Sequence, residues 1–319
     1  APEAGHQGRS EGTLRFESLP LSIKTLESLA DNKFDICTEI QAAAIPHALA
    51  GRDILGAAKT GSGKTLAFVI PVMELLFRER WSREDGLAAL IISPTRELAM
   101  QIFDVLRVVG KKHDFSAGLV TGGKKEYEEE QARIIGMNIL VATPGRLLQH
   151  FEETPGFESG QLQILVLDEA DRILDMGFQA QLDGLLQYLP DTRQTMLFSA
   201  TQTKRVKDLA RLSLTDPQYL AVQDSTGGLG GGLGLASLKD KRVGGNDEGP
   251  TEVNKLVQSY VVVKLEEKLD VLFSFIKSHQ KHKIIIFFST CSQCKFVFEI
   301  FRGMQPGVPL TALHGKIKQ

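Results

Sequence analysis

Two short stretches of the chain carry residues suited to phosphate and metal chemistry. The first, AKTGSGKT at 58–65, follows the apolar run DILGA and precedes residues with helical spacing. It matches the phosphate-loop pattern GxxxxGK[ST], except that Ala58 stands at the first glycine. Gly61 and Gly63 would let backbone N–H groups turn toward phosphate oxygens, and the helix N-terminus adds partial positive charge. We therefore expect Lys64 to contact the β- and γ-phosphates of a nucleotide, although a glycine-rich strand–helix turn is the alternative.

The second stretch is ILVLDEAD at 164–171, in which an apolar run meets three carboxylates. A buried strand that ends in Asp beside a phosphate loop is suited to Mg²⁺. We expect Asp168 and the Thr65 hydroxyl to hold this metal ion, directly or through water. Glu169 would then be free to orient or deprotonate an attacking water molecule. The acids could also form the first turn of a helix, and both interpretations can hold together.

Short apolar runs alternate with amphipathic stretches between residues 16 and 223. This alternation is typical of βαβ units, which build a parallel sheet covered by helices on both faces. We therefore predict a doubly wound parallel α/β domain. Its predicted strands are 53–57, 87–93, 116–122, 138–143, 164–168 and 194–199, and its predicted helices include 65–78, 95–110, 125–135 and 203–212.

Residues 224–250 interrupt this pattern, because they contain nine glycines and few large apolar residues. Such a composition predicts a flexible linker or insert, and residues 1–15 are predicted to be a flexible N-terminus. The βα alternation resumes in residues 251–319. We expect these residues to form a partial second domain, since about 70 residues are too few for a complete domain of the first type. Its predicted strands are 256–263 and 283–289, and its predicted helices are 265–279 and 291–303.

Composition sets limits on the class of protein. The 319 residues are 42% hydrophobic and 24% charged, which is ordinary for a globular protein. No apolar run reaches the roughly 18 residues that a membrane span needs. The formal net charge of −2 predicts no broad basic surface, so any nucleic-acid binding must use a local groove. Three cysteines favour a reducing compartment.

Several further motifs occur together with these two, in a fixed order. In this order the chain resembles the DEAD-box ATP-dependent RNA helicases from about residue 16 to residue 319, apart from the glycine-rich insert. The motifs are TEIQ at 38–41, AKTGSGKT at 58–65, PTRELA at 94–99, GG at 122–123, TPGR at 143–146, DEAD at 168–171, SAT at 199–201 and IIIFFST at 284–290.

The resemblance implies a RecA-like fold, with ATP and Mg²⁺ as cofactors. It implies that Gln41 reads the adenine edge, that Phe16 stacks on the base, and that Ser199 and Thr201 couple the nucleotide site to domain closure. The catalytic residues would be Lys64 and the two acids already named. The implied ATP-binding residues are Phe16, Gln41, Ala58, Lys59, Thr60, Gly61, Ser62, Gly63, Lys64 and Thr65.

The resemblance also implies contacts with RNA. Arginines, hydroxyls and glycines in PTRELA, GG and TPGR suit binding to a phosphate backbone, which carries no base identity. Arg96 and Arg146 could instead be surface salt-bridge residues. The implied RNA-binding residues are Pro94, Thr95, Arg96, Gly122, Gly123, Thr143, Pro144, Gly145 and Arg146.

Finer features resemble the nucleolar members of the family that act in ribosome biogenesis, on the precursor of the small-subunit rRNA. Among them are Lys59 and the stretches HDFSAGLVTGGK and DEADRILDMGF. This resemblance implies location in the nucleus and nucleolus and a role in rRNA processing. Pre-rRNA or small nucleolar RNA would be the RNA partner, ribosome-assembly proteins are possible partners, and no membrane is involved.

Two family segments are not found before Gln319, namely those of the ARGxD and HRxGRxxR types that supply the arginine finger. This leaves two hypotheses. The first is an ATP-driven helicase that clamps and locally opens RNA duplexes, of which this chain is most of the motor. The second is a truncated module that binds nucleotide and RNA with little hydrolysis of its own.

Overall fold

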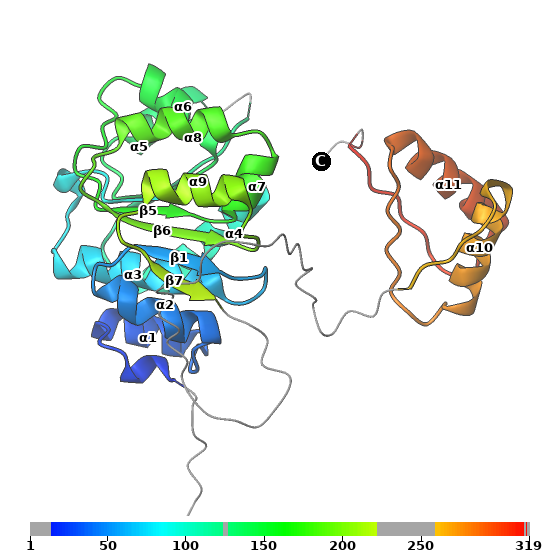
Figure 1. Ribbon diagram of the computed structural model, residues 1–319, viewed down its shortest axis with the longest axis horizontal. Coiled ribbons are helices and arrows are strands. Elements are labelled where there is room, and N and C mark those ends of the chain that lie inside the picture. The colour runs from blue at the N-terminus through cyan, green and yellow to red at the C-terminus, as the bar shows by residue number, and fades with distance from the viewer. Residues whose placement is uncertain (1–13, 124–126, 222–258, 316, 318–319) are drawn as a thin grey trace, which may run out of the picture. The chain divides into compact units, whose positions relative to one another are not determined.

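A computed structural model describes residues 14–123, 127–221 and 259–315, together with residue 317 (Figure 1). The chain divides into two compact units, Ala1–Ser225 and Thr226–Gln319. The predicted linker at 224–250 and nearly all of the predicted N-terminal segment at 1–15 lie outside the described residues.

The first unit is built on one sheet of seven parallel strands, in the order β3-β4-β2-β5-β6-β1-β7. This confirms the predicted parallel α/β fold and all six predicted strands. The strands are β1 (Ile54–Ala57), β2 (Ala89–Ile92), β3 (Ala117–Val120), β4 (Ile139–Ala142), β5 (Ile164–Leu167), β6 (Gln194–Ser199) and β7 (Gln218–Ala221).

Helices cover both faces of this sheet, as the predicted doubly wound arrangement requires. One face carries α1 (Ile23–Asp31), α2 (Glu39–Leu49), α3 (Lys64–Arg78) and α4 (Arg96–Val109). The other carries α5 (Tyr127–Ile134), α6 (Pro144–Glu153), α7 (Ala170–Asp175), α8 (Gln179–Tyr188) and α9 (Lys204–Ser213) (Figure 1). Short 3₁₀ turns lie at η1 (Phe16–Ser18), η2 (Arg83–Asp85) and η3 (Gly110–Lys112).

The central strands are apolar throughout because both of their faces are buried. In β5, Ile164 and Val166 belong to the core under α1–α4, whereas Leu165 and Leu167 belong to the core under the second helical layer. Side chains alternate across a strand, so a four-residue apolar run fills both cores. All four of these side chains are fully buried.

Strand β7 was not predicted. It lies at the edge of the sheet beside β1, and its residues alternate between half-buried and exposed. A short edge strand that buries little apolar surface leaves a weak signal in the sequence. Its position is fixed partly by the backbone of Gln218, whose N–H donates to the carbonyl of Asp53 over 2.8 Å.

The second unit contains η4 (Leu265–Glu267), α10 (Lys268–Ser278) and α11 (Cys291–Met304), which confirms both predicted helices. The two predicted strands are wrong as far as they are described, because neither 259–263 nor 283–289 is assigned as a strand; residues 256–258 lie outside the described part. The segment 283–289 is apolar, but the described residues provide no neighbouring strand to complete a hydrogen-bonded ladder.

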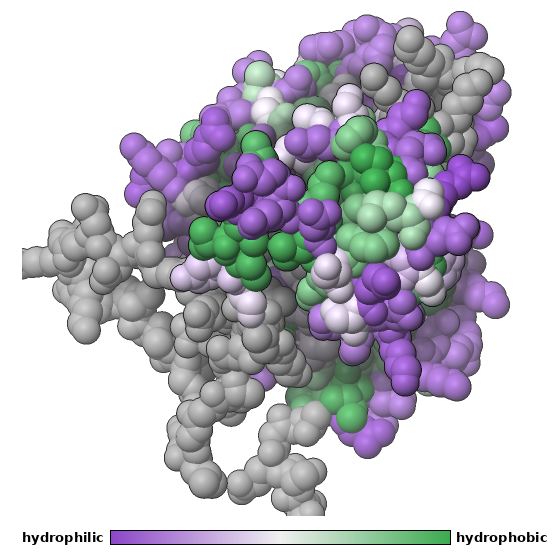
Figure 2. Space-filling view, turned by 90° about the vertical axis from the view of Figure 1, so that its right-hand side faces the viewer, coloured by the Kyte–Doolittle hydropathy of each residue, from purple (hydrophilic) through white to green (hydrophobic). Residues whose placement is uncertain are grey.

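One face of this segment packs on the helices and the other is uncovered. Ile286 and Phe288 contact the small core around Ile276, whereas Ile285 and Phe287 are 79% and 90% exposed. Apolar residues are visible at the surface on the side of the molecule shown in Figure 2.

In the part of the chain that the structure describes, no helix is both long and apolar enough to cross a membrane.

Candidate functional site

The predicted site residues meet at the carboxyl edge of the sheet. The phosphate loop follows β1, the DEAD acids follow β5 and SAT lies at the end of β6, and these three strands are neighbours. The motifs assigned to RNA follow β2, β3 and β4, which are also neighbours. The edge is therefore divided into two adjoining halves, which meet between β2 and β5. In open parallel sheets, ligands bind at this edge.

The phosphate loop joins β1 to α3. Its Gly61 and Gly63 have φ of +81° and +86°, left-handed values that favour glycine. Gly63 is the N-cap of α3, so the first N–H groups of that helix face the loop. The hydroxyl of Ser62 is buried without a hydrogen-bond partner among the described residues. These features fit a loop that donates hydrogen bonds to an anion.

Lys64 pairs with both acids of the DEAD motif. Its Nζ lies 3.2 Å from Asp168 Oδ1 and 3.4 Å from Glu169 Oε1, and all three side chains are at most 7% exposed. Burial raises the pKa of the Asp168 carboxyl, and the nearby Lys64 opposes this rise. The ammonium group of Lys64 therefore compensates the charge of the crowded carboxylates.

Arg172 was not predicted as a site residue, but it also contacts the acids. Its Nη1 lies 2.9 Å from Glu169 Oε2, so the Glu169 carboxylate lies between two cations. The spacing of three residues on a helix is the signal that could have identified this pair. Glu169 itself has φ +50° and ψ +51° at the N-cap of α7. This conformation is unusual for a residue other than glycine, and strain of this kind is concentrated at functional sites.

A second unpredicted residue, Asp171, joins the DEAD and SAT motifs. Its Oδ2 accepts hydrogen bonds from the backbone N–H and the hydroxyl of Thr201, each over 3.0 Å. The hydroxyl of Ser199 donates to the carbonyl of Thr201 over 2.8 Å. These hydrogen bonds join the DEAD and SAT motifs, and the coupling role of Ser199 and Thr201 stays a prediction.

Gln41 contacts the phosphate loop. Its Nε2 donates to the carbonyl of Gly63 over 2.8 Å, and its Oε1 accepts from the backbone N–H of Thr38 over 2.8 Å. The side chain is thus a capping-box residue of α2 and a brace for the loop. Within the described part of the chain, one N–H and one lone pair of the amide make no further hydrogen bond, and base reading by Gln41 stays a prediction.

Phe16 lies close to this motif. Its N–H donates to the carbonyl of Asp35 over 3.2 Å, and the N–H of Cys37 donates to the carbonyl of Leu14, which places Phe16 beside the residues that precede Thr38. The ring is 2% exposed and belongs to the core. Stacking of Phe16 on a base is therefore still a prediction, and it would require part of the ring to become accessible.

The second half of the edge contains an open depression of about 470 Å³. It is lined by Arg96, Gly122, Gly123, Gly145, Arg146 and Gln149. Five of these six residues were predicted to bind RNA. A Cβ atom at Gly122 or Gly123 would lie 3.6 or 3.8 Å from the Arg96 guanidinium, in ordinary van der Waals contact, so both glycines lie beside this side chain.

The other residues of these motifs hold the backbone in place. Thr95 caps α4 by accepting a hydrogen bond from the N–H of Leu98, and Pro94 is buried. Thr143 precedes α6, whose first residue is Pro144, a position that suits proline because its missing N–H needs no partner. These four residues position the walls of the depression and do not line it.

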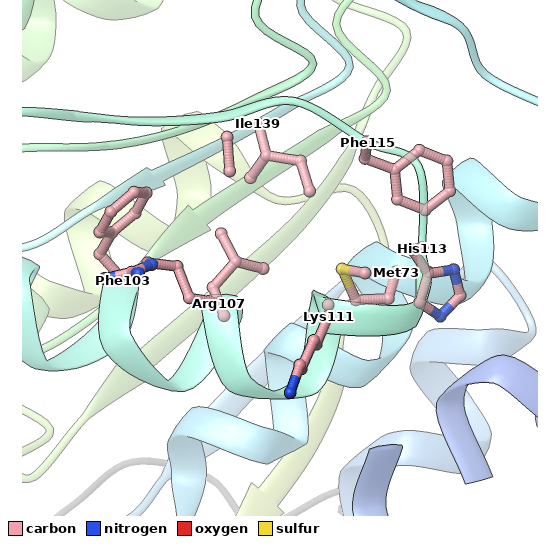
Figure 3. A pocket seen from close by; sticks show the side chains of 10 residues that line it. Met73, Phe103, Arg107, Lys111, His113, Phe115 and Ile139 are labelled. Atoms are coloured by element: carbon pink, nitrogen blue, oxygen red, sulfur yellow. The ribbon is translucent and has the colours of Figure 1, made fainter. Parts of the chain in front are cut away.

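A separate cavity of about 320 Å³ lies near the opposite edge of the sheet (Figure 3). Phe103, Phe115 and Ile139 form much of its apolar wall. Ile139 is the first residue of β4, which places the cavity at the amino end of the strands. None of the predicted site residues lines it.

Comparison with known proteins agrees with this geometry. The chain is 56% identical over 311 residues to "ATP-dependent RNA helicase DBP4" of Gibberella zeae, and 54% identical over 312 residues to "DEAD-box ATP-dependent RNA helicase 32" of Arabidopsis thaliana. Each alignment covers 98% of this chain, but only 36% and 39% of those relatives. The chain therefore spans little more than a third of their length.

A solved structure is also similar, that of a DEAD box protein from the hyperthermophile Methanococcus jannaschii. The TM-score is 0.61 at 27% identity, over 96% of this chain and 75% of that one. The profile described as "DEAD/DEAH box helicase" matches residues 38–209, which is more than half of the chain and includes both halves of the sheet edge. The chain belongs to the DEAD/DEAH box helicase family.

Proposed function

We propose that this chain is the ATP-binding part of an ATP-dependent RNA helicase that remodels RNA duplexes or RNA–protein complexes. The observation that carries this proposal is the shared sheet edge. A phosphate loop with its acids lies beside a depression lined by two arginines and three glycines. The hydrogen bonds between Asp171 and Thr201 provide a route by which a change at the nucleotide could alter the adjoining loops.

The nucleotide half fits ATP with Mg²⁺. Lys64 and the N–H groups around Gly61 and Gly63 are suited to phosphate oxygens. Among the described residues, no group of three or more His, Cys, Asp or Glu side chains could enclose a metal ion. The nucleotide half, which offers few protein ligands, fits Mg²⁺, because this ion is commonly held by one or two protein groups together with phosphates and water.

The residues that would hold Mg²⁺ are Asp168 and Thr65. Asp168 Oδ1 is buried and makes no hydrogen bond within the described residues; its one close cation is Lys64. Bound Mg²⁺ would neutralise charge on the β- and γ-phosphates. Glu169 would orient or deprotonate the attacking water once Lys64 has moved toward the phosphates.

The second half fits an RNA backbone. Arg96 and Arg146 offer charged donors, and Gly122, Gly123 and Gly145 allow a strand to approach the main chain closely. The described residues that line this depression include no aromatic ring, so base stacking is not part of the proposed contact. Binding would therefore depend on the backbone and the 2′-hydroxyl, without base readout.

Ribosome biogenesis is the proposed cellular context, with pre-rRNA or small nucleolar RNA as substrate, in the nucleolus. The support is the resemblance of HDFSAGLVTGGK and DEADRILDMGF to nucleolar family members, together with the identity to the two relatives named above. Crosslinking of the full-length protein in cells, followed by sequencing of the bound RNA, tests this context. Recovery of mainly mRNA would contradict it.

The biochemical proposal is tested with the Lys64→Ala variant. Because Lys64 is the phosphate-loop cation, its loss should weaken binding of fluorescent ADP and ATP strongly, whereas Lys207→Ala, an exposed lysine on α9, should leave affinity unchanged. RNA-stimulated phosphate release and duplex unwinding are then measured with the full-length protein. Nucleotide and RNA binding without any turnover in that protein would support the binding-module hypothesis instead.

A further inference from the structure

The two arginines of the RNA depression have different surroundings. Arg96 is exposed, and it makes no ion pair within the described residues. The side chain of Arg146 is only 5% exposed, and its Nε lies 3.2 Å from Oε2 of Glu130 on α5. This contact is an ion pair and not a well-aligned hydrogen bond, because Nε has no hydrogen-bond partner. The two residues thus present different net charges to a ligand.

Glu130 is itself fixed from the other side. The Nε2 of His150 lies 3.1 Å from the same Oε2, and Nδ1 of His150 lies 2.9 Å from the Thr154 hydroxyl. Burial lowers the pKa of His150, so the ring is neutral at physiological pH. A carboxylate can only accept, so Nε2 carries the proton and Nδ1 accepts from Thr154.

The ring of Tyr127 completes the enclosure. It stacks on His150 with the ring centroids 4.7 Å apart, and the guanidinium carbon of Arg146 lies 5.2 Å from its centroid. Arg146 Nη2 donates to the carbonyl of Gly123, and Nη1 donates to Gln149 Oε1 over 3.4 Å. The guanidinium therefore has a fixed orientation, with its Nη side at the depression and its Nε side on Glu130.

The buried group of Arg146, Glu130 and His150 carries no net charge. Arg146 contributes one positive charge, Glu130 one negative charge, and His150 none, so the group is neutral. A buried pair at 3.2 Å is screened little by salt. A phosphate at the depression would meet N–H donors of Arg146, but among the described residues that line it, Arg96 would carry the one uncompensated arginine charge.

We propose that Glu130 is the built-in counter-ion of Arg146, held in place by His150, and that it limits the electrostatic part of RNA binding at this depression. Glu130 is a positioning residue, since it acts on the RNA through Arg146. The inference rests on the proposed function, because it concerns the affinity of the same site for an RNA phosphate backbone. In this proposal, Arg146 orients an RNA phosphate through hydrogen bonds, whereas Arg96 supplies the net positive charge that attracts it.

The salt dependence of RNA binding measures this difference. For single strands, each neutralised phosphate adds about −0.7 to the slope of log K against log salt. Replacing Glu130 by glutamine leaves Arg146 uncompensated, so the slope should become steeper by about 0.7. Raising the salt from 50 to 200 mM should therefore weaken RNA binding by the variant by a further factor of about 2.6, beyond the loss seen in the wild type. At low salt the variant should bind RNA more tightly than the wild type.

Glutamine is a suitable replacement because it keeps the shape and the hydrogen bonds. Its amide oxygen can take the place of Glu130 Oε2, which faces both Arg146 Nε and His150 Nε2, so it can accept from both groups without a change of tautomer. Glu129→Gln is the matched control. Glu129 lies on the same helix, but it is 67% exposed and pairs with Arg133, so its loss removes one charge without freeing Arg146.

Fluorescence anisotropy of a labelled oligouridylate, with a non-hydrolysable ATP analogue present, gives the slope for each variant. Glu130→Gln should steepen it, Glu129→Gln should leave it near the wild-type value, and Arg96→Gln should flatten it by about 0.7. The double variant Glu130→Gln/Arg146→Gln should return the slope to the wild-type value, which also tests the inference if either single variant folds poorly.

The outcomes separate this inference from the proposed function. A wild-type slope for Glu130→Gln, or an equal change in Glu129→Gln, would overturn the counter-ion role while leaving RNA binding intact. Absence of RNA binding by the wild type, or no effect of Arg96→Gln, would instead remove the RNA site itself.

Discussion

Gly63 offers a sharp test of how the phosphate loop is held. Its backbone has φ +86°, and a Cβ atom at this position would lie 2.7 Å from Gln41 Nε2 and 3.0 Å from two atoms of Thr38. Gly61 has a similar φ of +81°, but a Cβ atom there would have nothing within 4 Å. Alanine at both positions suffers the same backbone strain, whereas only at Gly63 does it displace the Gln41 brace.

The expected loss of stability can be worked out from these contacts. A left-handed conformation costs an L-residue about 1–2 kcal/mol. At Gly63 the methyl group also disrupts the hydrogen bond from Gln41 to the Gly63 carbonyl, which contributes about 0.5–1.5 kcal/mol. Gly63→Ala should therefore lower the free energy of unfolding by about 1.5–3.5 kcal/mol, and Gly61→Ala by about 1–2 kcal/mol.

Urea unfolding followed by tryptophan fluorescence measures this difference. Trp81 is the only tryptophan in the sequence and lies in the first unit, where its indole N–H donates to the Gly86 carbonyl over 2.9 Å. The midpoint should fall further for Gly63→Ala than for Gly61→Ala. Equal midpoints for the two variants would refute the idea that Gln41 braces the loop through Gly63.

Three other predictions concern single residues. Glu169→Gln should retain binding of ATP with Mg²⁺ but slow hydrolysis, because Asp168 remains as the metal ligand; a nucleotide titration that showed lost binding would contradict this assignment. Gln41 should favour ADP over GDP by about 1–3 kcal/mol in measured binding free energy, since guanine reverses the donor and acceptor that the amide would read, and equal affinities would count against base reading. Burial lowers the pKa of His113, so the unfolded chain binds a proton more readily than the folded chain does. Stability should therefore decrease as the pH falls below about 6.5, and thermal unfolding of His113→Gln should show a weaker pH dependence than the wild type.

The sequence predicted the central part of the fold well because burial on both faces leaves a strong local signal. The run ILVL at 164–167 is typical of a strand buried on both faces of a parallel sheet, and it forms β5. The segment KIIIFFS at 283–289 has the same kind of composition, but it is not a strand in the described residues. A strand is defined by its hydrogen-bonded neighbours, and residue composition does not supply them.

The same distinction applies to the site. The meeting of Lys64, Asp168 and Glu169 was predictable because their motifs follow central strands of the parallel sheet, whereas their catalytic roles stay predictions. Glu130 was not predictable, although it touches Arg146, because its helix carries three consecutive glutamates with nothing local to distinguish them. Only the packing of α5 against α6, with His150 buried between Tyr127 and Thr154, shows that Glu130 is the glutamate paired with Arg146.

The two halves of the sheet edge use buried charge in opposite ways. At the nucleotide half, Lys64 compensates two acids, and a nucleotide that takes up this cation would leave Asp168 in need of a new positive partner. This change of partner for Lys64 would make the nucleotide half respond to ligand binding. At the depression proposed to bind RNA, Glu130 and Arg146 compensate each other within the protein. If RNA binds there, the hydrogen bonds of Arg146 would fix the geometry of the contact, while the attraction between opposite charges would stay limited.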